Sequence, residues 1–303
     1  MKFEKFEPSF QERPKEESPI ERIQRERREQ VGELEKFLKE VANEYKKLGI
    51  PVRDNCRIDM DGFRGVYPEE EIKNDKKYIK ELQDKWEGEA PIKKEDTERV
   101  GELLEKLVVA VLYKYLRDRF IVLRSSYHDD VCNKVDTVVV DKDTGNVVCA
   151  FDEVADLHGK IRGIKEEEIR RRNREKGGAY LKYGLSVERK NKEKIEIKLS
   201  SVKNLPIFYI ALSEGLVYQG IKNFNPDLKN FPQEEKNFFN YFIDLIKAQI
   251  GEIEKINERM KKMKKVGLNS TLLKRVEAFK EALREFEIEK PFLFEKKKKK
   301  RRR

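Results

Sequence analysis

Residues 135–154, VDTVVVDKDTGNVVCAFDEV, contain two runs rich in β-branched and aromatic residues, separated by the polar segment KDTGN. Apolar runs joined by Asp, Thr, Gly and Asn are typical of a β-hairpin. If the turn is centred on Thr144, residues whose numbers sum to about 288 lie opposite each other, and Asp136 faces Asp152. If the turn is one residue shorter, Asp136 faces Glu153. The hairpin therefore predicts two opposed carboxylates in either register.

The first of these registers also places Val138 opposite Ala150 and Val140 opposite Val148. Directly opposed side chains have Cβ atoms about 5 Å apart, and like charges at that spacing destabilise a sheet unless a cation or a proton lies between them. Mg²⁺ or Mn²⁺ is the expected partner, because hard cations take carboxylate and water ligands and these strands offer no cluster of thiolates or imidazoles.

The segments on both sides of the hairpin complete an α+β domain. A broad apolar face predicts a buried helix that is capped by Asp96 and runs to about Arg117. The other expected elements are a strand over 120–127, a charged helix over 164–176 that Gly177 and Gly178 end, a second hairpin over 181–201 and a buried strand over 205–212. We expect an α+β core over residues 97–226, with a mixed central sheet and flanking helices.

The buried helix offers a third carboxylate. At roughly 100° per residue, its apolar face centres near Val111. Glu105 lies about 100° from that centre, at the edge of the face, whereas Glu102 points almost directly away. Glu105 is therefore the better candidate ligand, and Glu102 is the alternative.

This order of elements and acids resembles the PD-(D/E)XK nuclease-like superfamily, whose fold is restriction-endonuclease-like. The matching segments are GELLEKLVVAVLYKYL in the helix, KVDTVVVDKDTGN in the second strand and its turn, and VVCAFDEV in the third strand. The resemblance implies that Glu105 or Glu102, Asp136, and Asp152 or Glu153 bind metal. It also implies hydrolysis of phosphodiester bonds in DNA, with Mg²⁺ or Mn²⁺ as the cofactor.

The same resemblance implies a lysine two residues after the acid of the third strand, where it assists the attacking water. At that spacing Val154 follows Asp152, and Ala155 follows Glu153. The lysine would therefore have to come from a neighbouring element. The catalytic candidates are Lys160, Lys176 and Lys182, which lie close downstream.

A polar cluster follows the first strand of the core. His128, Asp129 and Asp130 could add a general base or further ligands to the acidic site. Short polar clusters also commonly cap the ends of strands, so a purely structural role is the alternative.

A second acidic motif lies upstream of the core. In RIDMDGF, Asp59 and Asp61 resemble the Asp-x-Asp-Gly nucleophile motif of haloacid-dehalogenase-type phosphatases. That motif uses one aspartate to attack phosphorus and needs a buried strand immediately upstream. A phosphatase would therefore require residues 53–58 to form a strand.

The rest of the chain divides into helical and charged segments. Residues 1–30 are dense in mixed charges and contain three prolines, which predicts disorder. Helical spacing of apolar residues predicts a helical region over 31–96. An apolar stripe predicts a helical hairpin or short coiled coil over 227–290, which either packs on the core or forms a homodimer. Residues 291–303 form a basic tail.

The net charge of +10 comes mostly from the tail. Residues 296–303 are all basic, and without those eight the chain has 60 basic residues against 58 acidic ones. Such a run attracts phosphates through counterion release without reading base sequence, although a solvated or added tail has the same composition. Residues 160–176, with eight basic residues against four acidic ones, could also contact phosphates. We expect nucleic acid, DNA in particular, as the partner.

Composition excludes several classes of protein. The chain is 38% hydrophobic and 42% charged over 303 residues. It has no run of roughly 18 apolar residues, and its start lacks the apolar block of a secretory signal, so we expect a cytoplasmic protein without membrane contact. Three scattered cysteines and two histidines argue against a disulfide framework or a zinc site.

Two functions remain open at this stage. The first is a metal-dependent nuclease, either an endo- or an exodeoxyribonuclease, or a degenerate relative of one. The second is a non-catalytic nucleic-acid-binding or assembly module on a nuclease-like scaffold. Clustered acids favour the first function, and the missing lysine favours the second.

Overall fold

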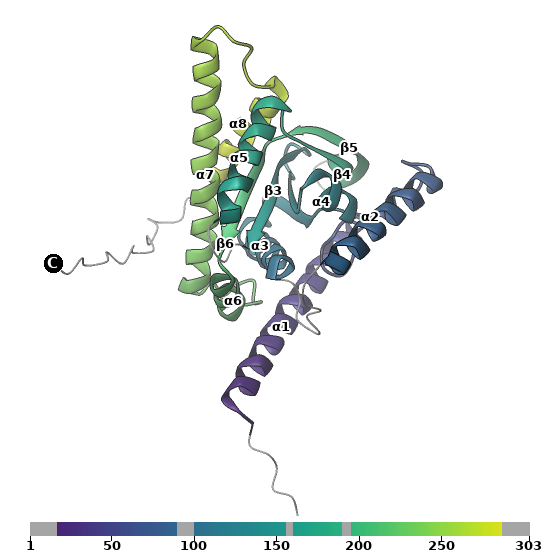
Figure 1. Ribbon diagram of the computed structural model, residues 1–303, viewed down its shortest axis with the longest axis vertical. Helices are drawn as coiled ribbons and strands as arrows, with labels where there is room; N and C mark the ends of the chain where they lie inside the picture. Colours follow the sequence, from purple (N-terminus) through teal and green to yellow (C-terminus); the bar gives the residue numbers. More distant parts are fainter. Residues whose placement is uncertain (1–16, 90–99, 156–159, 190–194, 287–303) are drawn as a thin grey trace, which may run out of the picture.

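The computed structural model describes residues 17–89, 100–155, 160–189 and 195–286 (Figure 1). The expected helix cap Asp96, the first sixteen residues and the basic tail lie outside these ranges. Within them the chain has a mixed α+β fold, with a small mixed sheet and flanking helices, as the sequence predicts. No helix in the described ranges is long and apolar enough to cross a membrane.

The central sheet has four strands in the order β1-β2-β3-β6. The first three, β1 (Phe120–Arg124), β2 (Thr137–Asp141) and β3 (Val147–Ala155), are antiparallel neighbours, and β6 (Ile207–Leu212) pairs in parallel with β3. The predicted hairpin and the later buried strand are confirmed. The strand predicted over 120–127 is shorter, because it ends at Arg124 and Ser126 caps a helix, α4 (Tyr127–Asn133). Every residue of β1, β2 and β6 is buried, which explains why these strands are apolar almost throughout instead of alternating.

The register of the β2–β3 hairpin agrees with the sequence prediction at its open end and differs near its turn. Val138 pairs with Ala150, as in the first predicted register. The register then shifts, and Val140 pairs with Val147 instead of Val148. A bulge of this kind leaves one residue unpaired and bends the strand. The period-2 pattern does not reveal it, because neighbouring positions on both strands are apolar.

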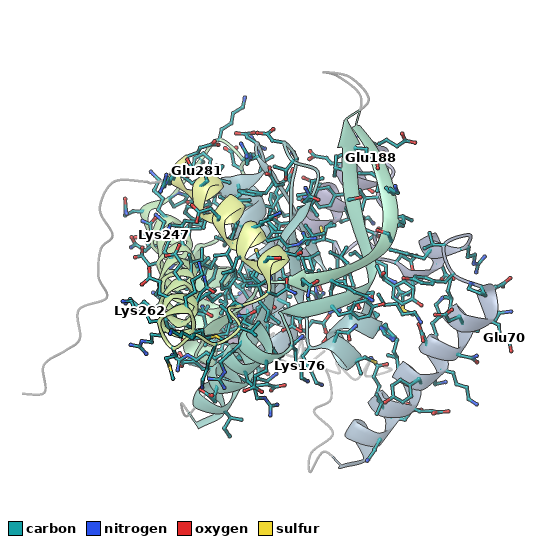
Figure 2. All side chains as sticks on the ribbon, turned by 90° about the horizontal axis from the view of Figure 1, so that it is seen from above. Glu70, Lys176, Glu188, Lys247, Lys262 and Glu281 are labelled. Atoms are coloured by element: carbon teal, nitrogen blue, oxygen red, sulfur yellow. The ribbon has the colours of Figure 1, made fainter. Side chains whose placement is uncertain are left out.

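The turn of this hairpin is held against a second sheet. β4 (Ala179–Arg189) and β5 (Ile195–Leu205) form a separate two-stranded ribbon, which confirms the predicted second hairpin. The ribbon extends away from the central sheet, with Glu188 near its far end (Figure 2). The backbone N of Val187 donates to Gly145 O at 2.7 Å. A Cβ at residue 145, where φ is +73°, would lie 1.7 Å from Val187 O, so only glycine fits there.

Helices flank the sheet. α3 (Val100–Leu116) packs on β1 and β3 and contacts α1 (Pro19–Lys47), while α5 (Lys160–Glu175) packs on β6 and β3. α7 (Gln233–Lys262) runs beside α5 and β6 along one side of the molecule, and α1 and α2 (Glu69–Glu89) lie on the other side (Figure 1). Because α1, α6 (Glu214–Asn223) and α7 also contact α3, this helix is buried nearly all round, as its broad apolar face predicts.

α1 begins at Pro19, well before the expected start near Val31. Ser18 and Glu21 form a capping box, in which Ser18 N donates to the Glu21 carboxylate at 2.8 Å and Glu21 N donates to Ser18 Oγ at 3.2 Å. Pro19 occupies the first helical position, where its missing N–H costs nothing. The prediction of disorder is therefore wrong for residues 19–30, which are helical although they are almost wholly exposed.

The C-terminal part consists of α6 (Glu214–Asn223), α7 and α8 (Ser270–Arg284), and Asn269 caps α8 as expected. The apolar stripe of α7 packs against β6, α3 and α6 of the same chain. Its buried members include Phe239, Ile243, Ile246, Ile250 and Ile253. Because the stripe is used within one chain, a homodimer through these helices would need another surface.

Candidate metal centre

Three carboxylates from three elements meet at one end of the central sheet. Glu105 comes from α3, Asp130 from α4 (Tyr127–Asn133) and Asp136 from the residue just before β2. One carboxylate oxygen of each residue lies within 4.8 Å of the other two. The sequence predicts Glu105 and Asp136 as ligands and Asp130 as an additional acid, and the structure brings these three together.

The short helix α4 puts two of these acids in place. Ser126 caps the start of α4 with its side chain, and Lys134 ends the helix with a φ of +51°. The chain then returns to the sheet, where Asp136 N donates to Phe151 O at 2.9 Å. Asp130, on the helix, and Asp136, at the start of β2, are therefore fixed on the same side as α3.

Two buried arginines pair with these carboxylates. Arg57 is 2% exposed, and its guanidinium donates to Glu105 and to Asp130, at 2.8 Å each. Arg124, the last residue of β1, is fully buried and donates to the same Glu105 oxygen at 2.6 and 3.2 Å. The Arg57 guanidinium also lies 4.2 Å from the centre of the Tyr127 ring. The sequence analysis did not identify either arginine.

Glu153 adds a fourth carboxylate. Its backbone N donates to the Asp136 carboxylate at 2.6 Å, so the two residues are neighbours across the hairpin. Both carboxylate oxygens of Glu153 are buried, and neither has a hydrogen-bond partner among the described residues. Burial, and then the charge of Glu105, raises the pKa of Glu153 to about 8. An ionised carboxylate that is buried without a partner is costly, so Glu153 needs a proton or a cation.

The pKa values of Asp136 and Glu105 are raised as well. Burial and the charge of Glu153 raise the pKa of Asp136 well above its ordinary value. Burial also raises the pKa of Glu105, although the guanidiniums of Arg124 and Arg57 oppose the rise. Without a metal, the cluster therefore holds protons at pH values where exposed carboxylates are charged.

The charges and atoms of the cluster fit one divalent cation. When all groups are ionised, the four carboxylates carry −4 and the two guanidiniums +2, so a charge of −2 remains. Ligands of one Mg²⁺ lie about 2.1 Å from it and up to about 4.2 Å from one another. Oxygens within 4.8 Å therefore need only a small closure around the ion. An all-oxygen donor set is the one that Mg²⁺ and Mn²⁺ take.

Asp152 does not join this cluster. Adjacent residues of a strand point to opposite faces of the sheet, and Asp152 pairs with Lys165 of α5 at 3.1 Å. Burial still raises the pKa of Asp152, and Lys165 opposes the rise. The predicted pair of Asp136 and Asp152 does not form, although this end of the hairpin has the first predicted register. The strand pairing ends at Thr137 and Phe151, and the Asp136 carboxylate accepts from the backbone N of Glu153 instead.

Glu102 lies at the edge of the cluster. Its side chain is 39% exposed and approaches Arg124 at 3.4 Å. The Glu105 side chain is 14% exposed and pairs with Arg57. These positions agree with the helical geometry that made Glu105 the better candidate.

Lys182, one of the candidate catalytic lysines, pairs with acids outside the carboxylate cluster. Lys182 Nζ pairs with Glu71 and with Asp75 of α2, at 2.6 Å each. Lys176 is exposed, and the side chain of Lys160 lies outside the described residues. Among the described residues, none of these lysines contacts the four carboxylates. Lys182 instead holds α2 against β4.

In the described structure, Asp129 and His128, the other members of the polar cluster after β1, contact neighbouring elements and not the carboxylate cluster. Asp129 is fully buried, and its carboxylate accepts from the backbone N of Lys182 at 2.7 Å and of Tyr183 at 3.0 Å. His128 Nε2 lies 3.8 Å from Asp75. Both residues therefore belong to the contact between α4, β4 and α2. Their positions agree with a structural role, which is the alternative that the sequence left open.

Residues 53–58 form turns and isolated bridges in the described structure, not a strand. Asp59 caps the 3-10 helix η1 (Met60–Phe63) with its side chain. Asp61 pairs with Lys76 at 2.5 Å. The buried strand that the phosphatase motif needs is absent here, so the phosphatase hypothesis has no support.

Comparisons with known proteins leave this site unassigned, because no family model, no curated protein and no solved structure matches the chain. Its function has to be argued from the geometry and charges of the cluster.

A first prediction concerns pH and divalent cations. In the metal-free protein the pKa of Glu153 is raised from 4.5 to about 8, so the folded state holds a proton that the unfolded state releases. This group's contribution to stability is complete below pH 4.5 and is lost as the pH rises to about 8, by up to about 1.4 kcal/mol per pH unit. Mg²⁺ or Mn²⁺ replaces protons, so it should raise the melting temperature more at pH 8.5 than at pH 6. A cation effect that does not grow with pH would contradict this site.

A second prediction separates Lys182 from the metal centre. Lys182→Met should lower the free energy of unfolding by about 1–3 kcal/mol, because it leaves Glu71 and Asp75 without their cation. Cation affinity should stay within about twofold of the original, well under 1 kcal/mol. Lys176→Met, at an exposed position, is the matched control and should change stability by less than about 0.5 kcal/mol. Denaturant unfolding and cation titration measure both quantities, and a large loss of cation affinity would assign Lys182 to the centre.

Proposed function

We propose that this protein is a divalent-cation-dependent nuclease, or a relative of one, that hydrolyses phosphodiester bonds in DNA. The observation that carries the proposal is the cluster of Glu105, Asp130, Asp136 and Glu153, whose charge exceeds that of its two arginines by −2. The proposal is also supported by where three of these acids lie: on the helix before the sheet, at the start of the second strand and on the third strand.

The four carboxylates would hold Mg²⁺ or Mn²⁺. When bound, such an ion lowers the pKa of a water ligand, holds the scissile phosphate and stabilises charge on the leaving oxygen. Arg57 and Arg124 hold Glu105 in place through hydrogen bonds of 2.6 to 3.2 Å. Pre-positioned carboxylates avoid reorganisation when the ion and the substrate bind.

The cations at the cluster are arginines, and this limits what they can do. Ala155 occupies the position where the related nucleases carry a lysine. An arginine keeps its proton in proteins, so Arg57 and Arg124 can balance charge but cannot accept a proton from water. The pKa of Glu153, about 8, applies to the cluster without metal, so Glu153 is the group whose proton a divalent cation would displace when it binds.

A second candidate function is a non-catalytic module that binds nucleic acid. The observation that favours it is the same pair of arginines, because they already donate to oxygens of Glu105 and Asp130. A cluster that carries its own cations can stay folded without a metal. In that case the fold would serve as a binding or assembly scaffold.

A cleavage assay tests the two functions. Single- and double-stranded DNA and RNA are incubated with the full chain in Mg²⁺ or Mn²⁺, beside Asp136→Asn and a chain that ends at Glu295, which lacks the basic run. We expect DNA cleavage that Asp136→Asn reduces by at least about a hundredfold, the size typical of losing one essential group. The control is Glu281→Gln, an exposed α8 carboxylate that pairs with Arg284 at 2.6 Å; Figure 2 labels Glu281.

The outcomes separate the hypotheses. Unchanged cleavage by Asp136→Asn would contradict the assignment of the carboxylate cluster as the active site. No cleavage under any of these conditions would contradict the proposal that the protein is a nuclease. Salt-dependent DNA binding without cleavage would then support the scaffold.

A further inference from the structure

A second polar site lies beside the β2–β3 turn, away from the carboxylate cluster. An open cavity of about 220 Å³ lies between this turn and the first half of α8. Its polar lining residues are Thr144, Asn146, Thr271, Lys274 and Arg275. Pockets that enclose drug-sized ligands measure roughly 300–1,000 Å³, so this cavity suits one small group or the end of a larger molecule.

Among the residues that the structure describes, no carboxylate pairs with the guanidinium of Arg275. Its Nη1 donates to Val147 O, whereas its Nε is buried and has no hydrogen-bond partner within the same ranges. Burial lowers the pKa of Arg275, and no carboxylate acts in the opposite direction. The buried arginines of the metal centre differ in this respect, because Arg57 and Arg124 both pair with Glu105. A partly buried cation without an anion is costly, so an external anion would relieve that cost.

The lining has the donors that an anion needs. No carboxylate side chain lines the cavity in the described part of the chain. Lys274 adds a second positive charge, and the hydroxyl of Thr271 can donate a hydrogen bond. Arg275 keeps guanidinium N–H groups besides the one that Val147 O accepts, and the Lys274 ammonium acts on a phosphate as a point charge.

We propose that this cavity binds a phosphate group. The group is carried either by a small phosphorylated compound or by the backbone of a nucleic acid, since the recognised chemistry is the same. β2 separates the cavity from Asp136, and five residues at about 3.3 Å each make roughly 17 Å. The site is therefore distinct from the metal centre and does not depend on the proposed nuclease.

Titration with inorganic phosphate tests the proposal. The full chain is titrated by calorimetry at constant ionic strength, with chloride as the balancing anion. We expect saturable binding that Arg275→Gln weakens at least about tenfold, as expected when a charge-assisted hydrogen bond and a positive charge are lost. Arg284→Gln is the matched control, because it removes an exposed arginine of the same helix that pairs with Glu281. Its phosphate affinity should equal that of the original chain.

A second variant covers the case in which Arg275→Gln does not fold. Thr271 and Lys274 are exposed, so Thr271→Val combined with Lys274→Ala removes two donors without disturbing the core. This variant should also weaken phosphate binding. Absence of saturable binding by the original chain, or equal affinities for the original chain and the variants, would overturn the proposal.

The source of the phosphate is decided by two further probes, adenosine monophosphate and a single-stranded DNA oligonucleotide without terminal phosphates. Weaker oligonucleotide binding by Arg275→Gln would assign the cavity to the nucleic-acid backbone. An effect on the mononucleotide alone would assign it to a small phosphorylated compound. These measurements need no divalent cation, so a failure of the nuclease proposal would leave them unchanged.

Discussion

Replacing Arg124 with methionine is expected to lower the free energy of unfolding by about 3–5 kcal/mol, because it breaks a buried ion pair and leaves the surrounding carboxylates with one guanidinium fewer. Arg124 is fully buried and donates to Glu105 at 2.6 and 3.2 Å. Arg57 would still pair with Glu105, but it also pairs with Asp130, so one guanidinium would have to balance the charges of Glu105, Asp130 and Asp136. Methionine is long and adaptable, so little of the loss should come from packing. Equilibrium unfolding in urea at pH 7 measures the change.

Two further variants separate the lost pair from general damage to the core. Adding Glu105→Gln to Arg124→Met removes the carboxylate charge that the lost guanidinium had balanced. This second substitution should recover about 1–2 kcal/mol of the free energy of unfolding. Arg64→Met removes an exposed arginine that pairs with Asp61 at 3.0 Å and should cost less than about 1 kcal/mol. If Arg124→Met cost no more than Arg64→Met, the buried arginine would have no structural part in the cluster.

The hairpin and its acids are predictable from sequence because they depend on residues close along the chain. The turn residues and the apolar runs of 135–154 fix both strands. Asp136 and Glu153 then have few registers available, and both registers considered place an acid near Asp136. What the pattern cannot decide is the bulge between Val139 and Val140, because shifting an apolar strand past apolar neighbours changes no buried polar group.

The two arginines are harder to predict because their partners are distant in sequence. Arg57 reaches Glu105 from a loop 48 residues earlier in the chain, and that loop has no periodic pattern. Arg124 does carry a signal, since it ends the otherwise apolar strand FIVLR. A charge in a strand buried on both faces needs a partner. The acids predicted at the same end of the sheet were the available partners.

Position along the chain did not predict which lysine lies close to the acids of the third strand. Lys165 is the lysine that meets the third strand, but α5 brings it to Asp152, on the face opposite Glu153. Lys182 follows α5 and lies on β4, where it meets α2.

The start of the N-terminal helix α1 could have been predicted from the sequence, because Ser18 and Glu21 have the spacing of a capping box around Pro19. Dense mixed charges and three prolines led to the prediction of disorder there.

Replacing Glu153 with glutamine should change the stability of the metal-free protein and its affinity for divalent cations in opposite directions. The neutral amide removes a group whose pKa of about 8 makes ionisation unfavourable in the folded protein. Without metal, the variant should be more stable than the original chain at pH 8.5, by about 1–3 kcal/mol, and the difference should shrink toward pH 5. With Mg²⁺ or Mn²⁺, the same variant should bind the ion at least about tenfold more weakly, since one carboxylate ligand is lost.

The opposite signs of these two effects are what make the variant informative. A residue that only supports the fold would destabilise the protein when replaced, whether or not a cation is present. A ligand whose charge is held unpaired for a cation should stabilise the metal-free protein and weaken the complex. Glu188→Gln, an exposed strand glutamate that pairs with Lys198 at 3.4 Å, should do neither. A loss of metal-free stability for Glu153→Gln at pH 8.5 would show that Glu153 has a stabilising partner, and the case for a cation between Glu153 and Asp136 would end there.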